Sequence, residues 1–145
     1  MRAVQTFLLT TCGLLVAASL AAQSAVGTWR TIDDATGEAK SHIEIYERDG
    51  KLYGKIAATL RPDAEETCST CSGERAGEPF VGMEIITAAE PDGTLEWDGG
   101  EIYDPQADKT YGLTLWIEAD EPNTLHVRGR HWTGLYRTQE WERVR

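Results

Sequence analysis

Apolar and polar residues alternate along most of this chain in short runs that end at turn signals. In residues 42–48, for example, Ile43 and Ile45 fall on one side of a period-two pattern and polar neighbours fall on the other. Such alternation is typical of a β-strand with one buried face. The dipeptide Asp49-Gly50 comes next and favours a tight hairpin turn. The pattern therefore predicts an all-β protein.

The alternation recurs in about nine runs, which lie at residues 26–32, 42–48, 52–58, 81–87, 94–98, 101–103, 111–118, 125–128 and 137–144. Short strands at this spacing are typical of a sandwich or a barrel. Because closure removes exposed sheet edges, we predict a single antiparallel meander β-barrel of about eight to ten short strands. Residues 60–80 break the alternation with Pro, Gly and Cys and are predicted to form an irregular loop.

The first 22 residues have the composition of a secretory signal peptide. Arg2 provides a positive start, residues 7–20 are apolar and uncharged, and Ser19-Leu20-Ala21 offers a cleavage site with small residues. The apolar run is shorter than the ~20 residues of a membrane span. We therefore predict a cleaved signal at residues 1–22, a single barrel domain at residues 23–145, and no membrane insertion after cleavage.

The formal net charge of −10 narrows the classes of partner. A nucleic-acid-binding protein presents Lys and Arg to phosphates, and an anionic membrane surface also attracts basic proteins. The acidic balance disfavours both partners and favours neutral or cationic ligands.

Cys68 and Cys71 remain once the signal segment, with Cys12, is removed. An even number of cysteines in an exported chain favours a disulfide, here one that holds the loop of residues 60–80. A redox-active pair and a metal site are the alternatives, although nearby acidic residues disfavour a reactive thiol and zinc requires further ligands. Neither a metal nor a cofactor is predicted.

Gly27-x-Trp29 stands at the head of the first strand and resembles the opening motif of the calycin barrels, which include the lipocalins. The resemblance implies that Trp29 closes the barrel floor and that an Arg from a late strand packs across the indole. Arg137 and Arg143 are the candidates for this residue.

A broader resemblance, to the DUF2147 family of small exported bacterial proteins, covers almost the whole chain after the signal. It rests on Gly27-x-Trp29, Ile43-Glu44-Ile45-Tyr46, Gly82-Met83-Glu84-Ile85, Trp97-x-Gly99-Gly100-x-Ile102-Tyr103-Asp104-Pro105, Lys109-Thr110-Tyr111, Leu125-x-Val127-Arg128-Gly129 and Arg137-Thr138-Gln139-x-Trp141. The resemblance implies a lipocalin-like barrel without agreed catalytic residues. It also favours a periplasmic location.

Aromatic residues and one Arg suit the lining of a barrel cavity for a small, partly apolar molecule. The candidates are Tyr103, Tyr111, Trp116, Arg128 and Trp141. A small barrel is equally able to fill its interior with its own side chains, and the alternation does not decide between the two. The first hypothesis is therefore a ligand-binding barrel, and the alternative is a protein-interaction or structural module with a filled core and a working surface on residues 60–80.

The chain contains none of the common catalytic motifs, such as G-x-S-x-G, H-E-x-x-H or a P-loop. An enzyme that uses Cys68 and Cys71, or a carboxylate, is the third hypothesis and the least favoured. We predict a binding protein.

Overall fold

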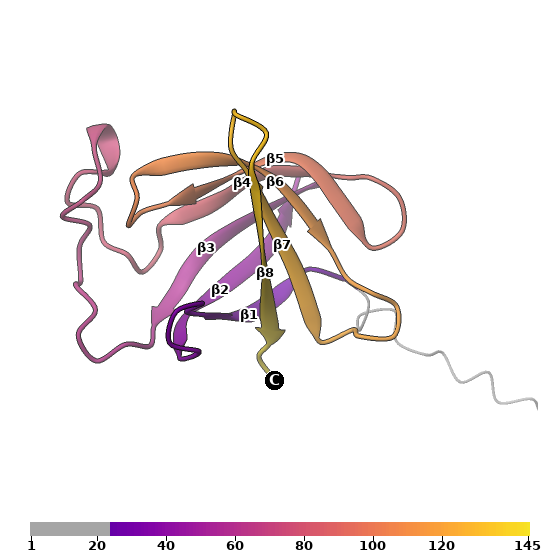
Figure 1. Ribbon diagram of the computed structural model, residues 1–145, viewed down its shortest axis with the longest axis horizontal. Helices are drawn as coiled ribbons and strands as arrows, with labels where there is room; N and C mark the ends of the chain where they lie inside the picture. Colours follow the sequence, from indigo (N-terminus) through magenta and orange to yellow (C-terminus); the bar gives the residue numbers. More distant parts are fainter. Residues whose placement is uncertain (1–23) are drawn as a thin grey trace, which may run out of the picture.

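The computed structural model describes residues 24–145, which form eight antiparallel strands around a closed barrel (Figure 1). The strands are β1 (Gly27–Ile32), β2 (Ala39–Arg48), β3 (Lys51–Thr59), β4 (Glu84–Pro91), β5 (Glu96–Asp104), β6 (Lys109–Trp116), β7 (Thr124–Arg130) and β8 (Tyr136–Arg143). Each strand pairs with the next, and β8 pairs with β1. The predicted meander barrel is confirmed. The signal-peptide prediction, at residues 1–22, lies outside the described residues.

Strand β5 joins two runs that the alternation separated. The sequence predicts strands at residues 94–98 and 101–103, whereas the structure has one strand with a bulge between Trp97 and Gly100. Gly99 adopts a φ of 70° at this bulge, a left-handed conformation that glycine allows at little cost. The apparent break in the pattern is therefore an extra residue within one strand, and the count falls to eight.

The hairpin between β2 and β3 is confirmed at the predicted position. Asp49 and Gly50 connect the strands with φ angles of 53° and 75°. Two successive positive φ angles are typical of a type I′ turn, whose twist matches the twist of the flanking strands.

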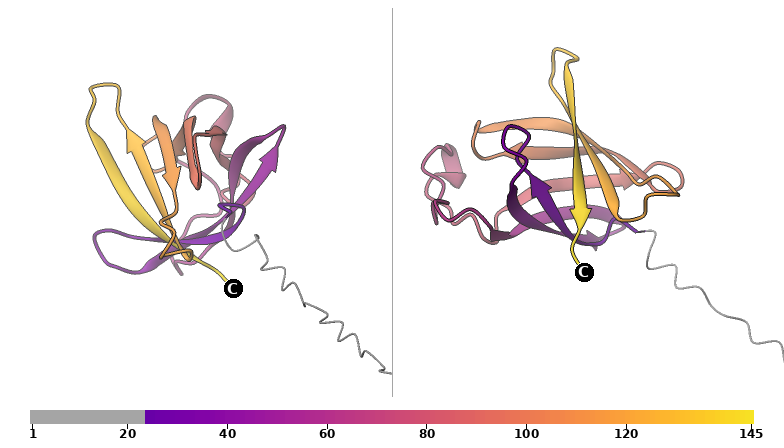
Figure 2. Two further views of the ribbon diagram at one scale, coloured as in Figure 1. Left: turned by 90° about the vertical axis from the view of Figure 1, so that its right-hand side faces the viewer. Right: turned by 60° about the horizontal axis from the view of Figure 1, so that its bottom comes forward.

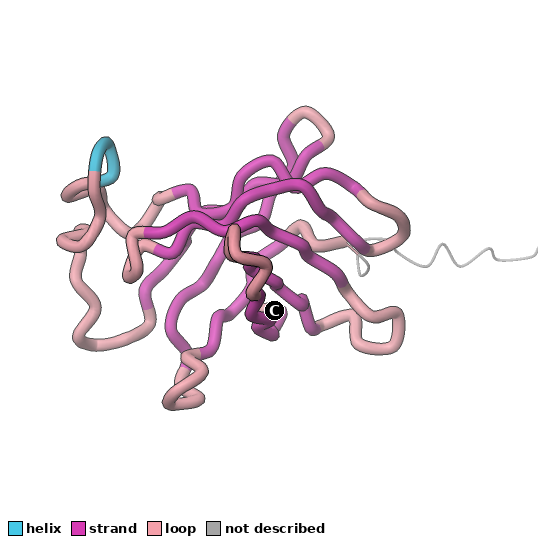
Figure 3. Tube along the Cα trace, turned by 45° about the horizontal axis from the view of Figure 1, so that its top comes forward, coloured by secondary structure: helices cyan, strands magenta, loops and turns pink. Residues whose placement is uncertain are grey.

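The meander gives the barrel two unlike ends (Figure 2). At the closed end lie the start of β1, the turns β2–β3 and β4–β5, and the connection β6–β7. At the other end, called the mouth here, lie the connections β1–β2, β3–β4, β5–β6 and β7–β8. The β3–β4 connection is the longest and contains the single-turn helix η2 (Gly73–Arg75), which stands apart from the strands in Figure 3.

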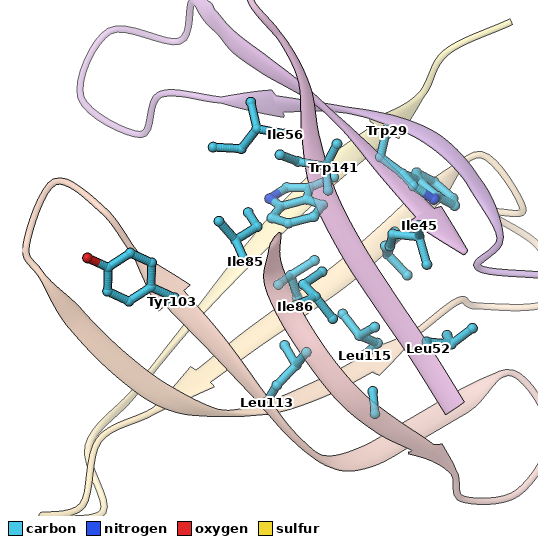
Figure 4. Close-up of a cluster of buried hydrophobic side chains, with 14 of the residues drawn as sticks. Trp29, Ile45, Leu52, Ile56, Ile85, Ile86, Tyr103, Leu113, Leu115 and Trp141 are labelled. Carbon is cyan, nitrogen blue, oxygen red and sulfur yellow. The ribbon is translucent and has the colours of Figure 1, made fainter. Parts of the chain in front are cut away.

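Apolar side chains from all eight strands fill the interior (Figure 4). Cross-strand pairs such as Ile43–Ile56, Leu115–Val127 and Leu125–Trp141 face inward, and every member of these pairs is buried. The burial of these side chains favours a filled core over an open calyx in the part of the chain that the structure describes.

Candidate functional site

The barrel floor is built on Trp29 and Arg143. Trp29 is fully buried, and its indole Nε1 donates a hydrogen bond to the carbonyl of Ala25 at 2.8 Å. The guanidinium carbon of Arg143 lies 4.2 Å from the centroid of the indole ring, and its nitrogens donate to the carbonyls of Ser24 and Pro122 at 2.8 and 3.2 Å. Burial lowers the pKa of Arg143. These contacts link the first strand of the barrel to the last, which gives Trp29 and Arg143 a structural role.

Arg137, the other candidate for the floor, lies at the mouth instead. Arg137 precedes Arg143 by six residues on β8, and it forms an ion pair with Asp34 of the β1–β2 connection. Gln139 donates to the same carboxylate at 3.3 Å. The prediction that Arg137 packs across Trp29 is therefore wrong, because the length of β8 separates it from the closed end.

Two of the five predicted lining residues face the interior. Trp141 is 2% exposed, and its indole Nε1 donates to Oε1 of Gln139 at 3.2 Å. Tyr111 pairs with Ile102 nearer the mouth and is half-buried. Trp141 belongs to the packed core, and Tyr111 is the predicted residue that faces inward nearer the mouth.

Trp116 and Arg128 lie on the outer face, so the prediction that they line the interior is wrong. Their strand neighbours Leu115 and Val127 form the inward pair, and alternation turns Trp116 and Arg128 outward. Trp116 stacks on the His126 ring with centroids 4.9 Å apart, and the Arg128 guanidinium lies 4.8 Å from the Trp116 ring centroid. The aromatic residues here cover the outside of the sheet.

Tyr103 is also outside the interior, because it alternates with the inward Ile102. The β3–β4 connection covers it, with the Arg75 guanidinium 4.2 Å from its ring centroid. Its hydroxyl donates to Oδ1 of Asp108 at 2.7 Å, and the backbone N–H of Ser72 donates to the same oxygen at 3.2 Å. Desolvation, together with this hydrogen bond, raises the pKa of Tyr103. Tyr103 therefore holds a loop and does not line a cavity.

Cys68 and Cys71 form a disulfide within this loop. Both are buried beside the carbonyl of Pro105, to which the Thr70 hydroxyl donates at 2.8 Å. The disulfide therefore helps to hold the β3–β4 connection against the β5–β6 turn. Among residues 24–145, no three His, Cys, Asp or Glu side chains gather closely enough to hold a metal ion.

The β7–β8 hairpin exposes three large apolar side chains, which we call the hairpin surface. Trp132 is 89% exposed, Leu135 75% and Tyr136 64%. The hairpin projects beyond the neighbouring strands in Figure 1. Sequence reasoning missed the hairpin surface, although Trp132 and Leu135 lie within and directly after a turn, where a short hairpin usually carries polar residues.

A groove lies between β1 and β8, which we call the seam groove. Its volume is about 500 Å³, and it is lined by Ile32, Asp34, Thr124, Thr138, Gln139, Glu140 and Glu142. The ion pairs Arg30–Glu142 and Arg137–Asp34 cross the seam. A second hollow of about 300 Å³ lies on the outer face near Trp116. Both hollows open to solvent, and their linings are largely polar.

An eight-stranded meander barrel with a Trp–Arg floor is the architecture of a lipocalin-like protein. The chain belongs to the DUF2147 family, described as uncharacterised proteins conserved in bacteria, whose model matches residues 27–143. Both sequence resemblances are thereby confirmed at the level of family and fold.

The fold is similar to that of a solved structure. It is protein HP1028 from the human pathogen Helicobacter pylori, described as belonging to the lipocalin family, with 17% sequence identity and a TM-score of 0.73 over 84% of each chain. The comparison with curated proteins found no match. Within residues 24–145, no helix has the length and apolarity that crossing a bilayer requires.

Proposed function

We propose that this chain is an exported, non-catalytic binding module that recognises a protein partner through the β7–β8 hairpin. The observation that carries the proposal is the exposure of Trp132, Leu135 and Tyr136 within one short hairpin. Exposed Trp and Leu side chains bury little apolar surface in the free protein, and clustered apolar residues of this kind mark interaction sites. Tyr and Trp are also the residues that most often dominate binding energy at protein interfaces.

The packed interior supports this class of function over cargo binding in the barrel. Trp29, Trp141 and the surrounding aliphatic residues occupy the space that a calyx ligand requires. We place the interaction surface on the hairpin and not on the loop of residues 60–80, because the loop is mainly polar and is held by the disulfide and Tyr103.

A small, partly apolar ligand at the mouth is the competing function. Tyr111 and Ile102 face inward and are only half-buried, which is the observation that favours it. Native mass spectrometry of protein purified without denaturation separates the two functions. A bound mass that disappears on unfolding supports the mouth ligand, and a bare mass supports the filled barrel.

Two features support export to an oxidising compartment, which we take to be the periplasm. The segment of residues 7–20 has the character of a signal peptide, and Cys68 is disulfide-bonded to Cys71. The net charge of −10 favours a partner with a neutral or basic surface over nucleic acid or an anionic membrane.

Site-specific photo-crosslinking in cells that produce the full chain tests the proposal. We expect a photoreactive residue at Trp132 to give a discrete protein adduct, and the same residue at Val81 to give none. Val81 is the control because it is 57% exposed and apolar but lies outside the hairpin. The Trp132→Ser/Leu135→Ser variant should lose an adduct formed from position Tyr136 without a lower Tm. Equal labelling from Val81 and Trp132, or an adduct unaffected by the double substitution, contradicts the proposal.

A further inference from the structure

The ladder that closes the barrel between β1 and β8 is short. It comprises two residue pairs, Trp29–Arg143 and Arg30–Glu142, and the N–H of Val144 donates to the carbonyl of Thr28 at 2.9 Å just beyond them. Toward the mouth the two strands are no longer paired, although β8 continues back to Tyr136. The view in the left panel of Figure 2 shows the two strands spreading apart there.

The direction of each backbone group on β8 follows from its ladder with β7. At one end of this ladder the N–H of Arg143 donates to Asn123 at 2.9 Å, and at the other the N–H of His131 donates to Leu135 at 2.7 Å. The intervening register has no bulge. Both bonds place odd-numbered residues of β8 in the hydrogen-bonded pairs with the β7 side.

Even-numbered residues of β8 therefore point their N–H and C=O groups away from β7. At Glu142 and Val144 these groups meet β1. At Thr138 and Glu140 they face the seam beyond the end of the β1 ladder. Unpaired edge groups of this kind are a template for another strand.

The seam groove lies along this edge. Thr138 and Glu140 form part of one wall, and Ile32 and Asp34 form part of the other, around a volume of about 500 Å³. The groove thus lies beside the hydrogen-bonding edge, and the contacts of Asp34 with Arg137 and Gln139, which cross the seam at the mouth, must open for a strand to enter. Addition of an extended peptide to a free sheet edge is an established mode of peptide recognition.

Glu140, whose carboxylate forms no Arg or Lys ion pair among the described residues, gives the groove its charge preference. Asp34, Glu140 and Glu142 contribute carboxylates, and the Glu140 side chain is 70% exposed. Asp34 and Glu142 are already paired with Arg, whereas the ion-pair partner of Glu140 within residues 24–145 is His126, with Nδ1 at 3.8 Å. A second copy of this chain, with a net charge of −10, would add further like charge to this groove.

We propose that β8 accepts an extended, basic segment of a partner protein as an added strand in the seam groove. This inference rests on the proposed function and deepens it, because the hairpin surface stands at the mouth end of the same strand edge. The backbone of Thr138 and Glu140 would provide the hydrogen bonds, and the Glu140 carboxylate would select a cationic side chain.

Amide hydrogen exchange in the free protein tests the edge itself. The N–H groups of Thr138 and Glu140 should exchange much faster than those of Gln139 and Trp141, which lie in the β7 ladder. Equal protection at all four positions overturns strand addition, since it means that the edge is already paired. The proposed hairpin function is untouched by this result.

Binding is tested with a fluorescent KVKVKVKV peptide, its EVEVEVEV counterpart, and a KVKVKVKV peptide N-methylated at alternate residues. Thr138→Pro removes a seam-facing N–H without disturbing the β7 ladder, and Pro is tolerated on strand edges. Thr138→Ala is the matched control, because it removes only the hydroxyl that accepts from Arg128 Nε at 3.2 Å.

The basic peptide should bind the wild type and Thr138→Ala alike. Thr138→Pro, N-methylation or the acidic sequence should each weaken binding about tenfold, which corresponds to the loss of roughly one hydrogen bond or charge contact. The N-methylated peptide keeps the test valid if Thr138→Pro fails to fold. Absence of basic-peptide binding, or equal affinity for the basic and N-methylated peptides, overturns the inference. If the photo-crosslinks depend on Trp132 but are unchanged in Thr138→Pro, the proposed hairpin function is supported and the proposal of strand addition is wrong.

Discussion

The Arg143 guanidinium covers the Trp29 indole at 4.2 Å and so joins the last strand of the barrel to the first. The same guanidinium donates to the carbonyls of Ser24 and Pro122, which would otherwise lie at the floor with fewer partners. The Arg143 side chain therefore links β8 to β1, and it also holds the segments of Ser24 and Pro122 against the closed end of the barrel.

Replacing Arg143 should destabilise the whole barrel. We expect Arg143→Ala to lower the free energy of unfolding by about 2–4 kcal/mol, because a desolvated cation–π contact and several hydrogen bonds are lost together. The free energy of unfolding of Arg143→Lys should lie between those of the wild type and Arg143→Ala, since Lys keeps the charge but lacks the planar fork of donors. Urea unfolding measures the effect, and Arg145→Ala, at an exposed position, is the control. Similar losses for Arg143→Ala and Arg145→Ala would show that the floor contact contributes little.

Acid should weaken the attachment of the β3–β4 connection through Asp108. Hydrogen bonds from Ser72 and from the Tyr103 hydroxyl lower the pKa of Asp108 below its ordinary value of 3.8. A carboxyl with a lower pKa in the folded state contributes stability above its unfolded pKa, and loses it as pH falls through the folded pKa. The difference in unfolding free energy between wild type and Asp108→Asn should therefore be constant near neutral pH and shrink below about 3.8.

Thermal unfolding followed from neutral to strongly acid pH measures this difference. Tyr103→Phe keeps the ring beneath Arg75 and removes only one of the two donors, so its pH dependence should be intermediate. If Asp108→Asn and wild type lose stability in parallel over the whole range, the hydrogen-bonded carboxylate is not a source of acid sensitivity.

The disulfide should stabilise its own loop and little else. Cys68 and Cys71 are separated by three positions, so the closed loop is small and its entropic contribution is about 2 kcal/mol or less. Cys68→Ser/Cys71→Ser should accelerate hydrogen exchange in residues 60–80 and leave exchange in β6 and β7 unchanged. Because both sulfurs are buried, the native disulfide should also resist mild reductants. Rapid reduction of the folded protein would instead support the hypothesis that Cys68 and Cys71 form a redox-active pair.

Local alternation predicted the strands, and the Gly27-x-Trp29 motif predicted the floor, because both are properties of short segments. The side that each aromatic residue faces was harder to predict. Trp116 lies between Leu115 and Ile117, so both faces of that run are apolar and the pattern does not say which one is buried. Tyr103 is covered by Arg75 from a distant loop, which no local pattern reports.

The candidate site was less predictable than the fold for a related physical reason. The seam depends on where the first and last strands stop pairing, at Arg30 and Glu142, and such long-range register has no local sequence signal. The hairpin surface did have a signal, because Trp132 and Leu135 are large apolar residues in and next to a turn, where polar residues are usual. Apolar residues that break a barrel's in–out pattern are therefore a stronger signal of a surface site than aromatic residues that fit it.

Gly100 lies on β5 directly against the backbone of β4, which leaves no room for a side chain. A Cβ atom at Gly100 would lie 2.7 Å from the carbonyl oxygen of Thr87 and 2.8 Å from the Cα and N of Ala89. All three are backbone atoms of β4, so relief requires the strand itself to move. We therefore expect Gly100→Ala to cost about 1–3 kcal/mol or slightly more, the range for overpacked cores.

Gly112 provides the matched control on the next strand. A Cβ there would find its nearest neighbour, the Arg130 carbonyl oxygen, at 3.8 Å, so Gly112→Ala should be neutral or slightly stabilising. Urea unfolding of both variants gives the comparison, with fluorescence of the buried Trp residues as the signal. A clear loss for Gly100→Ala alone means that the glycine is needed for the close approach of two strands, and no ligand need be invoked for it. Equal, small effects would mean that β4 yields easily at this point, and Gly100 would then need another explanation.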